Sequence, residues 1–553
     1  MKFPQFQRRY LVPFKIAKIS HRFTDILVIG SGAAGNSAAI AAVAVPGTEV
    51  LLLSKVDLPE CSTQYAQGGI AAVLAPEETD DSLDSHVEDT IEAACGLADP
   101  EVVRLVVEEG VQRVEELIRW GARFDMKEGR IHFTREGGHS RPRILHTGDT
   151  TGKEIERTLL HEMEKHRAIV TLQGTYAVDL ITRDGMCHGA LVHRPSEGLQ
   201  AIWAKRTILA TGGTGRLFRE TTNPQVTTGD GFAIALRAGA VLRDPEFIQF
   251  HPTTLYIAGA DRFLITEAVR GEGGLLIDKE GQRFMHRFHP RAELAPRDTV
   301  SRGILTRMKE LCDTKVFLDL SGISAEKILE RFPKIHEFCL GFGIDILKEP
   351  IPVRPSAHYT VGGIRTDKEG RTDLQGLFAA GEVASSGLHG ANRLGSNSLL
   401  EGLVFGARAG AQAAREARGI PHGPMPFDPP DQDFWQGDIQ GKEHLDLPDL
   451  TMSLQSEMWR RVGIERTGTG LRHALAQIEE WTPYVLGAAF LHPAAWTLQN
   501  MLLTGYAIGS GALRRQESRG VHFRADFPDR DDALWGRHQD LRLSDLITAE
   551  EQH

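Results

Sequence analysis

Near its start the chain carries a hydrophobic pattern that changes period twice. Asp25–Gly30 (DILVIG) is a continuous apolar run that predicts a buried strand, and the alanine-rich stretch Asn36–Val45 predicts a helix. Glu49–Ser54 (EVLLLS) is apolar again and predicts a second strand. The glycine turn GSGAAG, Gly30–Gly35, joins the first strand to the helix. This order of elements is typical of a parallel βαβ unit.

The glycine turn favours a dinucleotide ligand. Its glycines allow a tight turn, after which the N-terminus of the helix points at a pyrophosphate. A nicotinamide cofactor is usually met by an acidic residue at the end of the second strand, but Ser54 and Lys55 stand there. The pattern therefore predicts dinucleotide binding and weakens the case for a nicotinamide cofactor.

A second glycine-rich segment, Gly376–Gly406, lies far along the chain. It is nearly free of charge, yet it contains Glu382, His389, Asn392 and Arg393 among small residues. Glycine lets backbone donors approach a bulky, partly polar ligand closely. A site assembled from both ends of a domain, with another region inserted between them, is a pattern found in flavoproteins.

The remaining patterns predict three further parts. Lys205–Gly215 (KRTILATGGTG) predicts a strand and a glycine turn at the same site, and Asp230 precedes an alanine-rich helix. Residues 245–357 are rich in His and Arg and predict an inserted domain. A proline-rich stretch near 422–435 predicts a linker, and segments 454–467, 471–481 and 498–520 have helical spacing.

The predicted fold class is α/β, a Rossmann-like FAD-binding domain with an inserted α+β capping domain and a C-terminal helical domain. The predicted boundaries are an N-terminal extension at 1–22, FAD-binding parts at 23–244 and 358–422, a capping domain at 245–357 and a helical domain at 423–553.

Composition and charge exclude several classes of function. The chain has 553 residues, 41% of them hydrophobic and 25% charged, as expected of a globular protein with two or three domains. Its net charge of −11 argues against a nucleic-acid partner. Five scattered cysteines without a CxxC pair exclude a disulfide framework and predict no metal site. These features fit a cytoplasmic protein.

Two segments raise the question of membranes and targeting. The uncharged run Ile26–Pro46 contains Gly and Ser residues that favour a strand, turn and helix over a membrane span, so no membrane contact is predicted. The first 24 residues are basic and contain no acid. A targeting peptide is one interpretation of them, although a continuous apolar segment is missing. The preferred interpretation is a disordered or loosely docked extension.

Seven motifs, in order, resemble the succinate dehydrogenase/fumarate reductase flavoprotein family. They are STQYAQGGIAAV (62–73), TREGGHS (134–140), QFHPTTL (249–255), TEAVRGEGG (266–274), ELAPRDTVSR (293–302), AHYTVGGI (357–364) and HGANRLGSNSLLEG (389–402). The resemblance covers roughly residues 23 to 530. It also accounts for Ser54 and Lys55, because the ribose end of FAD in this family does not depend on the usual acid.

The resemblance implies FAD as the cofactor, bound noncovalently. Members of the family that are bound to membranes link FAD to a histidine before the AAQGG stretch, where this chain has Ser62. Serine cannot form that link. The implied FAD contacts are Ser31, Gly32, Ala33, Ala34, Lys55, Ser62, Thr63, Gln64, Tyr65, Ala66, Gln67, Gly68, Gly69, Asp230, Glu382, Ser398 and Leu399.

The resemblance also implies a substrate pocket beneath the flavin. Its residues are His251, Thr266, Arg297, His358 and Arg393. Together these supply the forked guanidinium and imidazole donors that a C4 dicarboxylate requires. Arg297 is implied as the proton-transfer residue, an unusual role because a free guanidinium has a pKa above about 12. Arg270 either contributes to the pocket or forms a salt bridge with Glu267 or Glu272.

Glu136 decides between branches of the family. The loop TREGGHS resembles that of the members that oxidise L-aspartate, in which a glutamate faces the substrate amine. The alternative is a surface pair of Glu136 with Arg135 or Arg141. The implied reaction gives iminoaspartate, with O2 or fumarate as acceptor, and would feed a quinolinate synthase. A soluble fumarate reductase or succinate dehydrogenase flavoprotein subunit is the main alternative, and a flavin-binding subunit without turnover is the other.

Overall fold

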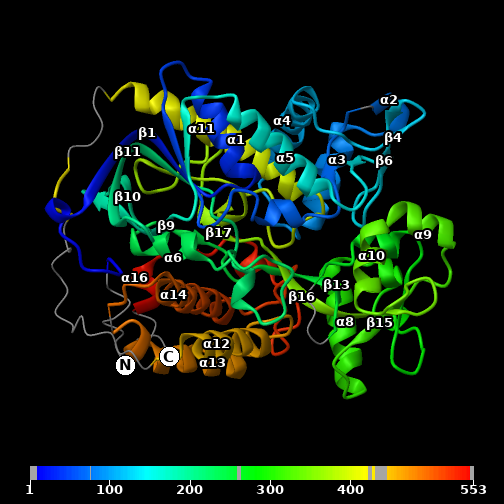
Figure 1. Ribbon diagram of the computed structural model, residues 1–553. Helices are drawn as coiled ribbons and strands as arrows, with labels where there is room; N and C mark the ends of the chain where they lie inside the picture. The colour runs from blue at the N-terminus through cyan, green and yellow to red at the C-terminus, as the bar shows by residue number, and fades with distance from the viewer. Residues whose placement is uncertain are drawn as a thin grey trace.

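A seven-stranded sheet is the largest sheet in the computed structural model, which describes residues 9–74, 76–257, 263–420, 426–429, 445–487 and 489–547 (Figure 1). Its path runs β8-β2-β1-β11-β10-β9, and β18 pairs with β11. The strands are β1 (Ser20–Ile29), β2 (Val50–Leu53), β8 (Ile169–Leu172), β9 (Tyr176–Arg183), β10 (Met186–Arg194), β11 (Gly198–Leu209) and β18 (Leu377–Ala379). Pairing is parallel except where β10 meets β9 and β11. The predicted α/β class is confirmed.

The first βαβ unit agrees with the hydrophobic pattern, although its helix begins earlier than predicted. α1 (Ala33–Val43) starts directly after Gly32, because the glycine turn is tighter than the pattern indicates. A side chain at Gly30, where φ is +116°, would place its Cβ 2.1 Å from the carbonyl oxygen of Ala210. The turn therefore requires glycine on both conformational and steric grounds.

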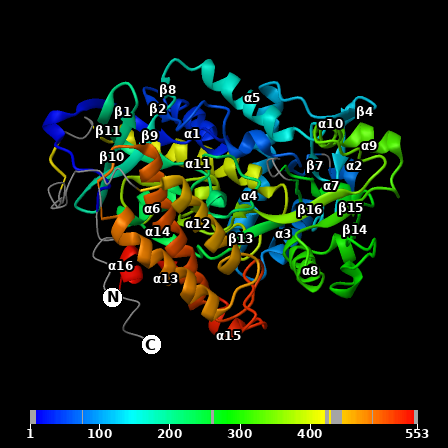
Figure 2. The same ribbon diagram turned by 60° about the horizontal axis from the view of Figure 1, so that its bottom comes forward.

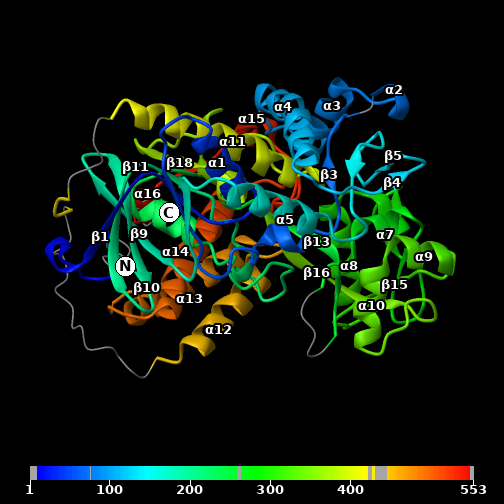
Figure 3. The ribbon, with the colours of Figure 1, turned by 45° about the horizontal axis from the view of Figure 1, so that its top comes forward.

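The two glycine-rich segments meet through helix packing. α11 (Asn397–Arg418) lies against α1, and Figure 3 shows the two helices side by side over the sheet. A Cβ at Gly410 would lie 2.0 Å from the backbone oxygen of Ala38. This close backbone approach brings the start of α11 to the same edge of the sheet as the start of α1. α4 (Pro100–Arg119) and α5 (Thr151–Glu164) complete the layer on this face.

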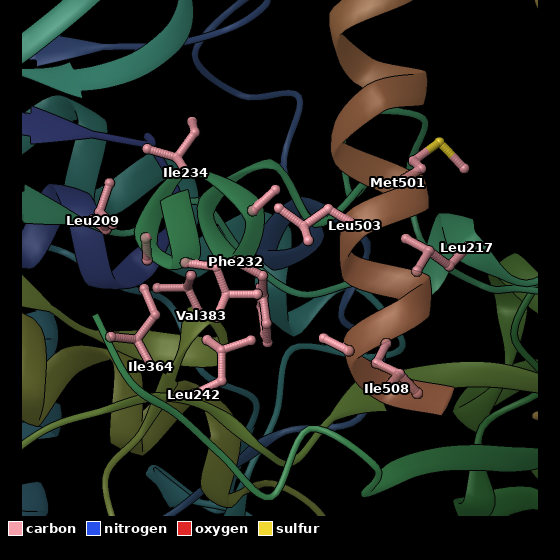
Figure 4. Packing of buried hydrophobic residues seen from close by; sticks show 14 of the residues in the cluster. Leu209, Leu217, Phe232, Ile234, Leu242, Ile364, Val383, Met501, Leu503 and Ile508 are labelled. Carbon is pink, nitrogen blue, oxygen red and sulfur yellow. The ribbon is translucent and has the colours of Figure 1, made fainter. Parts of the chain in front are cut away.

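The opposite face of the sheet is covered by α6 (Asp230–Arg237) and by C-terminal helices. These are α12 (Leu447–Arg461), α13 (Gly468–Val485) and α14 (Pro493–Arg514), seen in front in Figure 2. Figure 4 shows Met501, Leu503 and Ile508 of α14 in the same apolar core as Phe232 of α6. The predicted helical C-terminal region is confirmed.

The last predicted helix is too long. It was expected to continue to residue 520, but α14 ends at Arg514. Arg515 instead turns inward and donates from Nε to Glu246 Oε1 at 2.7 Å and from Nη1 to Glu517 Oε1 at 3.1 Å. A further helical turn would have placed Arg515 and Glu517 along the surface of the helix. They are buried in these ion pairs instead. The predicted linker at 422–435 lies mostly outside the described residues.

The inserted region forms a separate lobe, drawn in green in Figure 1. Long strands β13 (Ile248–Leu255) and β16 (Ile351–Thr360) lead out of the first domain and back, and pair with each other. They continue the sheet β13-β16-β15-β14 with β15 (Val316–Asp319) and β14 (Leu275–Ile277). α8 (Arg297–Glu310), α9 (Ala325–Arg331) and α10 (Pro333–Gly341) surround a core of its own. The predicted boundary at 357/358 falls inside β16.

The described part of the N-terminal segment is firmly docked, contrary to the expectation of a loosely attached extension. Tyr10, Leu11, Val12 and Phe14 are buried against a cluster that includes Trp203 of β11 and Trp496 of α14. The backbone N–H of Leu11 donates to Asp179 Oδ2 at 2.8 Å. Apolar side chains within this basic segment thus cover the outer face of the sheet. Residues 1–8 lie outside the described part.

Short elements complete the described fold. They are β3 (Ile70–Ala71), α2 (Pro76–Thr79), α3 (Leu83–Ala93), β4 (Met126–Lys127), β5 (Arg130–Ile131), β6 (Phe133–Thr134), β7 (Ile144–Leu145), β12 (Leu242–Arg243), α7 (Glu267–Gly271), β17 (Gly363–Arg365), β19 (Ala384–Ser385), α15 (Asp532–Trp535), β20 (Asp540–Leu541) and α16 (Leu543–Ile547). None of the described helices is both long enough and apolar enough to cross a membrane.

Candidate active site

One large cavity joins the two glycine-rich segments to the inserted lobe. Its empty volume, including the open mouth, is about 1810 Å³. Every residue predicted for the cofactor or the substrate lines it, with the exception of Gln64. Gln64 belongs to the short 3-10 helix Ser62–Tyr65, in which consecutive side chains point in different directions.

The N-terminus of α1 opens onto the cavity. Gly32 is the N-cap and offers no side chain to the first helical N–H groups, of which that of Ala33 donates to Thr63 Oγ1 at 3.0 Å. The positive end of the helix dipole and the other N–H groups of the first turn are available to an anion. This is the geometry that suits a pyrophosphate.

A carboxylate marks the far end of the cavity. Lys55 Nζ donates to Asp230 Oδ2 at 2.9 Å, while Tyr176 Oη and Asn500 Nδ2 donate to Oδ1 at 2.9 and 2.7 Å. Burial acts to raise the pKa of Asp230, but Lys55 and these hydrogen bonds hold it below its ordinary value. An acid from α6, rather than one at the end of the second strand, thus lines this part of the cavity.

Glu382 belongs to the second glycine-rich segment and lines the cavity. Its Oε1 accepts the backbone N–H of Thr360 at 2.9 Å. Burial raises the pKa of Glu382 to about 7. The group can therefore act as a donor or as an acceptor toward a hydroxyl.

The wall of the cavity fits a bound FAD. In the described part of the chain, Gln67 Oε1 and Thr211 Oγ1 are buried and have no protein partner, and both residues line the cavity. Apolar side chains such as Ile234 and Leu399 lie along the same wall. A cavity with a helix N-terminus, buried carboxylates and unpaired polar atoms has groups of the kind that a flavin dinucleotide needs.

Arg297 begins α8 in the inserted lobe and lines the cavity from that side. Its Nε donates to Glu267 Oε2 at 2.6 Å, and Arg270 Nη2 lies 3.5 Å from Glu267 Oε1. Arg270 does not line the cavity, so its salt bridge with Glu267 is the correct alternative. Glu272 pairs instead with Lys327. An Arg–Glu–Arg chain thus leads from the cavity into the inserted lobe.

Two histidines meet at the crossing between the domains. The ring centroids of His251 and His358 are 5.2 Å apart, and the ring planes are inclined at 63°. Burial and neighbouring arginines lower the pKa of both well below the ordinary value, so both imidazoles are neutral. His358 Nδ1 bonds to Thr222 Oγ1 at 2.8 Å, and His251 Nε2 has no partner within the described residues. Thr266 also lines this end, where its hydroxyl caps α7.

Glu136 is buried, in the loop between β6 and β7. Its Oε2 accepts the hydroxyl of Ser396 at 2.7 Å. Arg141 pairs with Asp80 at 3.2 Å instead, so the predicted alternative of a surface pair with Arg141 is wrong. Burial raises the pKa of Glu136, although Arg297 and the Ser396 bond act against this shift. The loop is tied down where His139 Nε2 bonds to the carbonyl of Gly395 at 2.9 Å.

Several residues of the site were not predicted. Gln249 Oε1 accepts from Arg297 at 3.4 Å and from Arg393 at 3.2 Å, and so holds both guanidiniums. Gln249 is the first residue of the motif QFHPTTL, so the sequence alone could have indicated that it belongs to the site. No sequence motif indicates that Asn500 belongs to the site, because it is one polar residue in a long apolar helix.

Searches by sequence place the chain among flavoproteins. The FAD binding domain family matches residues 25–399, and the family "Fumarate reductase flavoprotein C-term" matches residues 492–547. L-aspartate oxidase of Yersinia pestis is 43% identical over 527 residues, which span 92% of this chain and 97% of that protein. The enzyme of Streptomyces coelicolor is 42% identical over 94% of this chain and 91% of its own length. Chloroplastic L-aspartate oxidase 2-b of Nicotiana tabacum is 44% identical, with coverage of 92% and 82%.

Two solved structures that share this architecture are more than 30% identical to the chain. A mutated FrdA of E. coli quinol fumarate reductase superposes with a TM-score of 0.87 at 32% identity and covers 95% of both chains. Sdh1 of Mycobacterium smegmatis gives a TM-score of 0.82 at 35% identity, with coverage of 94% and 91%.

Proposed function

Because this chain belongs to the L-aspartate oxidases of the succinate dehydrogenase/fumarate reductase flavoprotein family, we propose that the cavity is the active site of that reaction. L-aspartate loses two electrons and two protons and becomes iminoaspartate. The acceptor is O2, which becomes H2O2, or fumarate, which becomes succinate. This is the first step of de novo NAD biosynthesis.

One observation carries the choice of substrate. A buried carboxylate, Glu136, lines the cavity together with the guanidiniums of Arg297 and Arg393. The two arginines suit the two carboxylates of a C4 acid. A third carboxylate beside them would repel succinate, whereas it attracts the α-ammonium of aspartate. Glu136 is therefore proposed to hold the amine.

The remaining residues of the substrate pocket are proposed to orient the substrate or to transfer a proton to it. His251, His358 and Thr266 are proposed to donate to or accept from the substrate carboxylates. When bound, FAD supplies the two-electron redox chemistry. Arg297 is proposed to give a proton to fumarate in the reductive half-reaction, since its Nε already lies on Glu267 and a chain to Arg270 can replace the proton.

The FAD itself is proposed to be noncovalent. Ser62 Oγ lies 3.3 Å from Thr227 Oγ1, in the region where a histidine would be needed for a covalent link. Acid denaturation of the purified protein should therefore release all of the yellow FAD into the supernatant. Flavin fluorescence that stayed with the polypeptide on a denaturing gel would contradict this proposal.

The chemistry of the product, iminoaspartate, suggests which enzyme acts next. Iminoaspartate is a reactive imine, and we propose that a quinolinate synthase consumes it. A cytoplasmic location is proposed from the five scattered cysteines, which form no CxxC pair. An absence of nucleic-acid partners is proposed from the net charge of −11.

Anaerobic reduction tests the proposed function. L-aspartate added to the oxidised holoenzyme should bleach the yellow absorbance, and fumarate or O2 should restore it. Succinate is the control that lacks the amine. Bleaching by succinate, with no response to L-aspartate, would assign the chain to the soluble succinate dehydrogenase alternative instead.

A further inference from the structure

Arg393 carries a buried charge, and no carboxylate among the described residues neutralises it by direct contact. Its Nη1 donates to Gln249 Oε1 at 3.2 Å and its Nη2 to Ser398 Oγ at 2.8 Å, and both acceptors are neutral. Its Nε has no hydrogen-bond partner among the described residues. Burial and the nearby Arg297 lower the pKa of Arg393 to about 10. Arg297, by contrast, has Glu267 as a direct ion-pair partner.

An arginine that binds a substrate anion faces a conflict. A buried cation needs compensation, because the transfer of an unpaired charge out of water is costly. A permanent carboxylate partner would supply it, but that partner would occupy the N–H groups that the substrate needs. A compensating group that leaves the N–H donors free would satisfy both requirements.

The ring of Tyr359 meets this description. The Cζ atom of Arg393 lies 4.6 Å from the centroid of the ring, within the distance of about 6 Å for a cation–π contact. The face of an aromatic ring attracts the cation through the quadrupole of the ring. It does not occupy the N–H groups at the edge of the planar guanidinium, which stay free to donate to a carboxylate. Tyr359 lines the cavity from β16, one residue after His358.

The ring is held in place from behind. Tyr359 Oη donates to Glu401 Oε2 at 2.9 Å. The carboxylate of Glu401 is fixed in turn by Ser386 Oγ at 2.5 Å and by His389 Nε2 at 3.1 Å. Burial and Glu401 raise the pKa of Tyr359 well above the ordinary value, so the phenol stays protonated and remains a donor.

We infer that Tyr359, braced by Glu401, is a positioning residue that stabilises the unpaired guanidinium of Arg393 and presents its free N–H groups to a substrate carboxylate. This role rests on the proposed function, in which Arg393 binds one carboxylate of the C4 substrate. Tyr359 touches Arg393 and acts on the substrate through it.

The test separates the effect of the aromatic ring of Tyr359 on KM from the effect of its hydroxyl. Tyr359→Leu removes the π face and should raise KM for L-aspartate by about 5- to 30-fold, while kcat changes by less than about threefold. Tyr359→Phe keeps the face, loses the contacts of the hydroxyl with Glu401 and His389, and should restore most of the affinity. Tyr256→Leu is the matched control, because it removes a Tyr–Arg contact of 5.1 Å with Arg354 outside the cavity. FAD content and Tm are measured for each variant.

A double-mutant cycle separates positioning from general packing. In an Arg393→Gln background, Tyr359→Leu should add less than about a twofold further increase in KM, because the two residues act as one unit. An undiminished effect in that background, an unchanged KM in Tyr359→Leu, or an equal loss in Tyr359→Phe would overturn the inference. If Tyr359→Leu does not retain FAD, Tyr359→Met fills more of the volume of the ring and serves the same comparison. Absence of L-aspartate turnover in the wild type would reject the proposed function instead.

Discussion

Replacement of Arg297 by leucine is expected to lower fumarate reduction by about 10²- to 10⁴-fold, the usual contribution of a general acid. Aspartate oxidation should fall strongly as well, because the same guanidinium orients the substrate. The flavin spectrum should remain, since Arg297 belongs to the inserted lobe and its hydrogen bonds run to Glu267 and Gln249. Steady-state rates with each acceptor provide the measurement.

Arg291→Leu is the matched control for this variant. Arg291 is an exposed arginine of the same lobe and does not line the cavity. Its replacement should leave both activities unchanged. Fumarate turnover near the wild-type rate in Arg297→Leu would show that another group donates the proton, and the chain through Glu267 and Arg270 would lose its proposed role.

Glu136→Gln is expected to lower kcat/KM for L-aspartate by about 10- to 150-fold. The substitution keeps size and hydrogen bonding but removes the negative charge that faces the ammonium. A hydrogen bond to a charged group contributes about 1.5–3 kcal/mol, and each ~1.4 kcal/mol is a factor of ten in kcat/KM. Fumarate lacks the amine, so its reduction should be unchanged or improved. The ratio of the two activities, mutant against wild type, is the informative quantity.

Glu128→Gln, at an exposed position just before the Glu136 loop, should leave this ratio unchanged. Equal losses for aspartate and fumarate in Glu136→Gln would mean that Glu136 serves only to hold the loop.

The raised pKa of Glu136 adds a pH dependence to the same comparison. The carboxylate is charged only above its folded-state pKa, which burial shifts upward. As the pH falls through that value, aspartate kcat/KM in the wild type should decline at a higher pH than an ordinary carboxyl would give. In Glu136→Gln this acid-side decline should be lost. A decline that persisted unchanged would assign the titration to another group.

The hydrophobic pattern predicts most of the fold because its strongest signals are local. The apolar run of β1, the glycine turn and the alanine-rich α1 are contiguous, and each follows from backbone sterics or burial. The end of α14 could not be predicted from its own residues. It depends on Glu246, which lies far away in the chain and forms a buried ion pair with Arg515.

The N-terminal segment shows the same limit. Its basic composition suggested loose attachment, but the partners of Tyr10 and Phe14 include Trp203 and Trp496, which only the folded chain brings together.

The candidate site was predictable where it coincides with family motifs and not elsewhere. Glu136, Arg297 and Arg393 stand in motifs, and the structure gathers them at one end of the cavity. Asn500 reaches Asp230 from the C-terminal helices, a contact that no sequence pattern announces. Gln64 was included because its neighbours were, although the turn of the short helix directs it elsewhere.

Oxygen uptake on addition of L-aspartate tests the central claim most directly. The holoenzyme should consume O2 and form H2O2 with L-aspartate, and should do neither with succinate under the same conditions. Turnover of succinate with an artificial acceptor, without any O2 uptake on L-aspartate, would contradict the account and favour a soluble fumarate reductase or succinate dehydrogenase subunit. Bound FAD without turnover of either substrate would contradict it as well and leave a flavin-binding subunit.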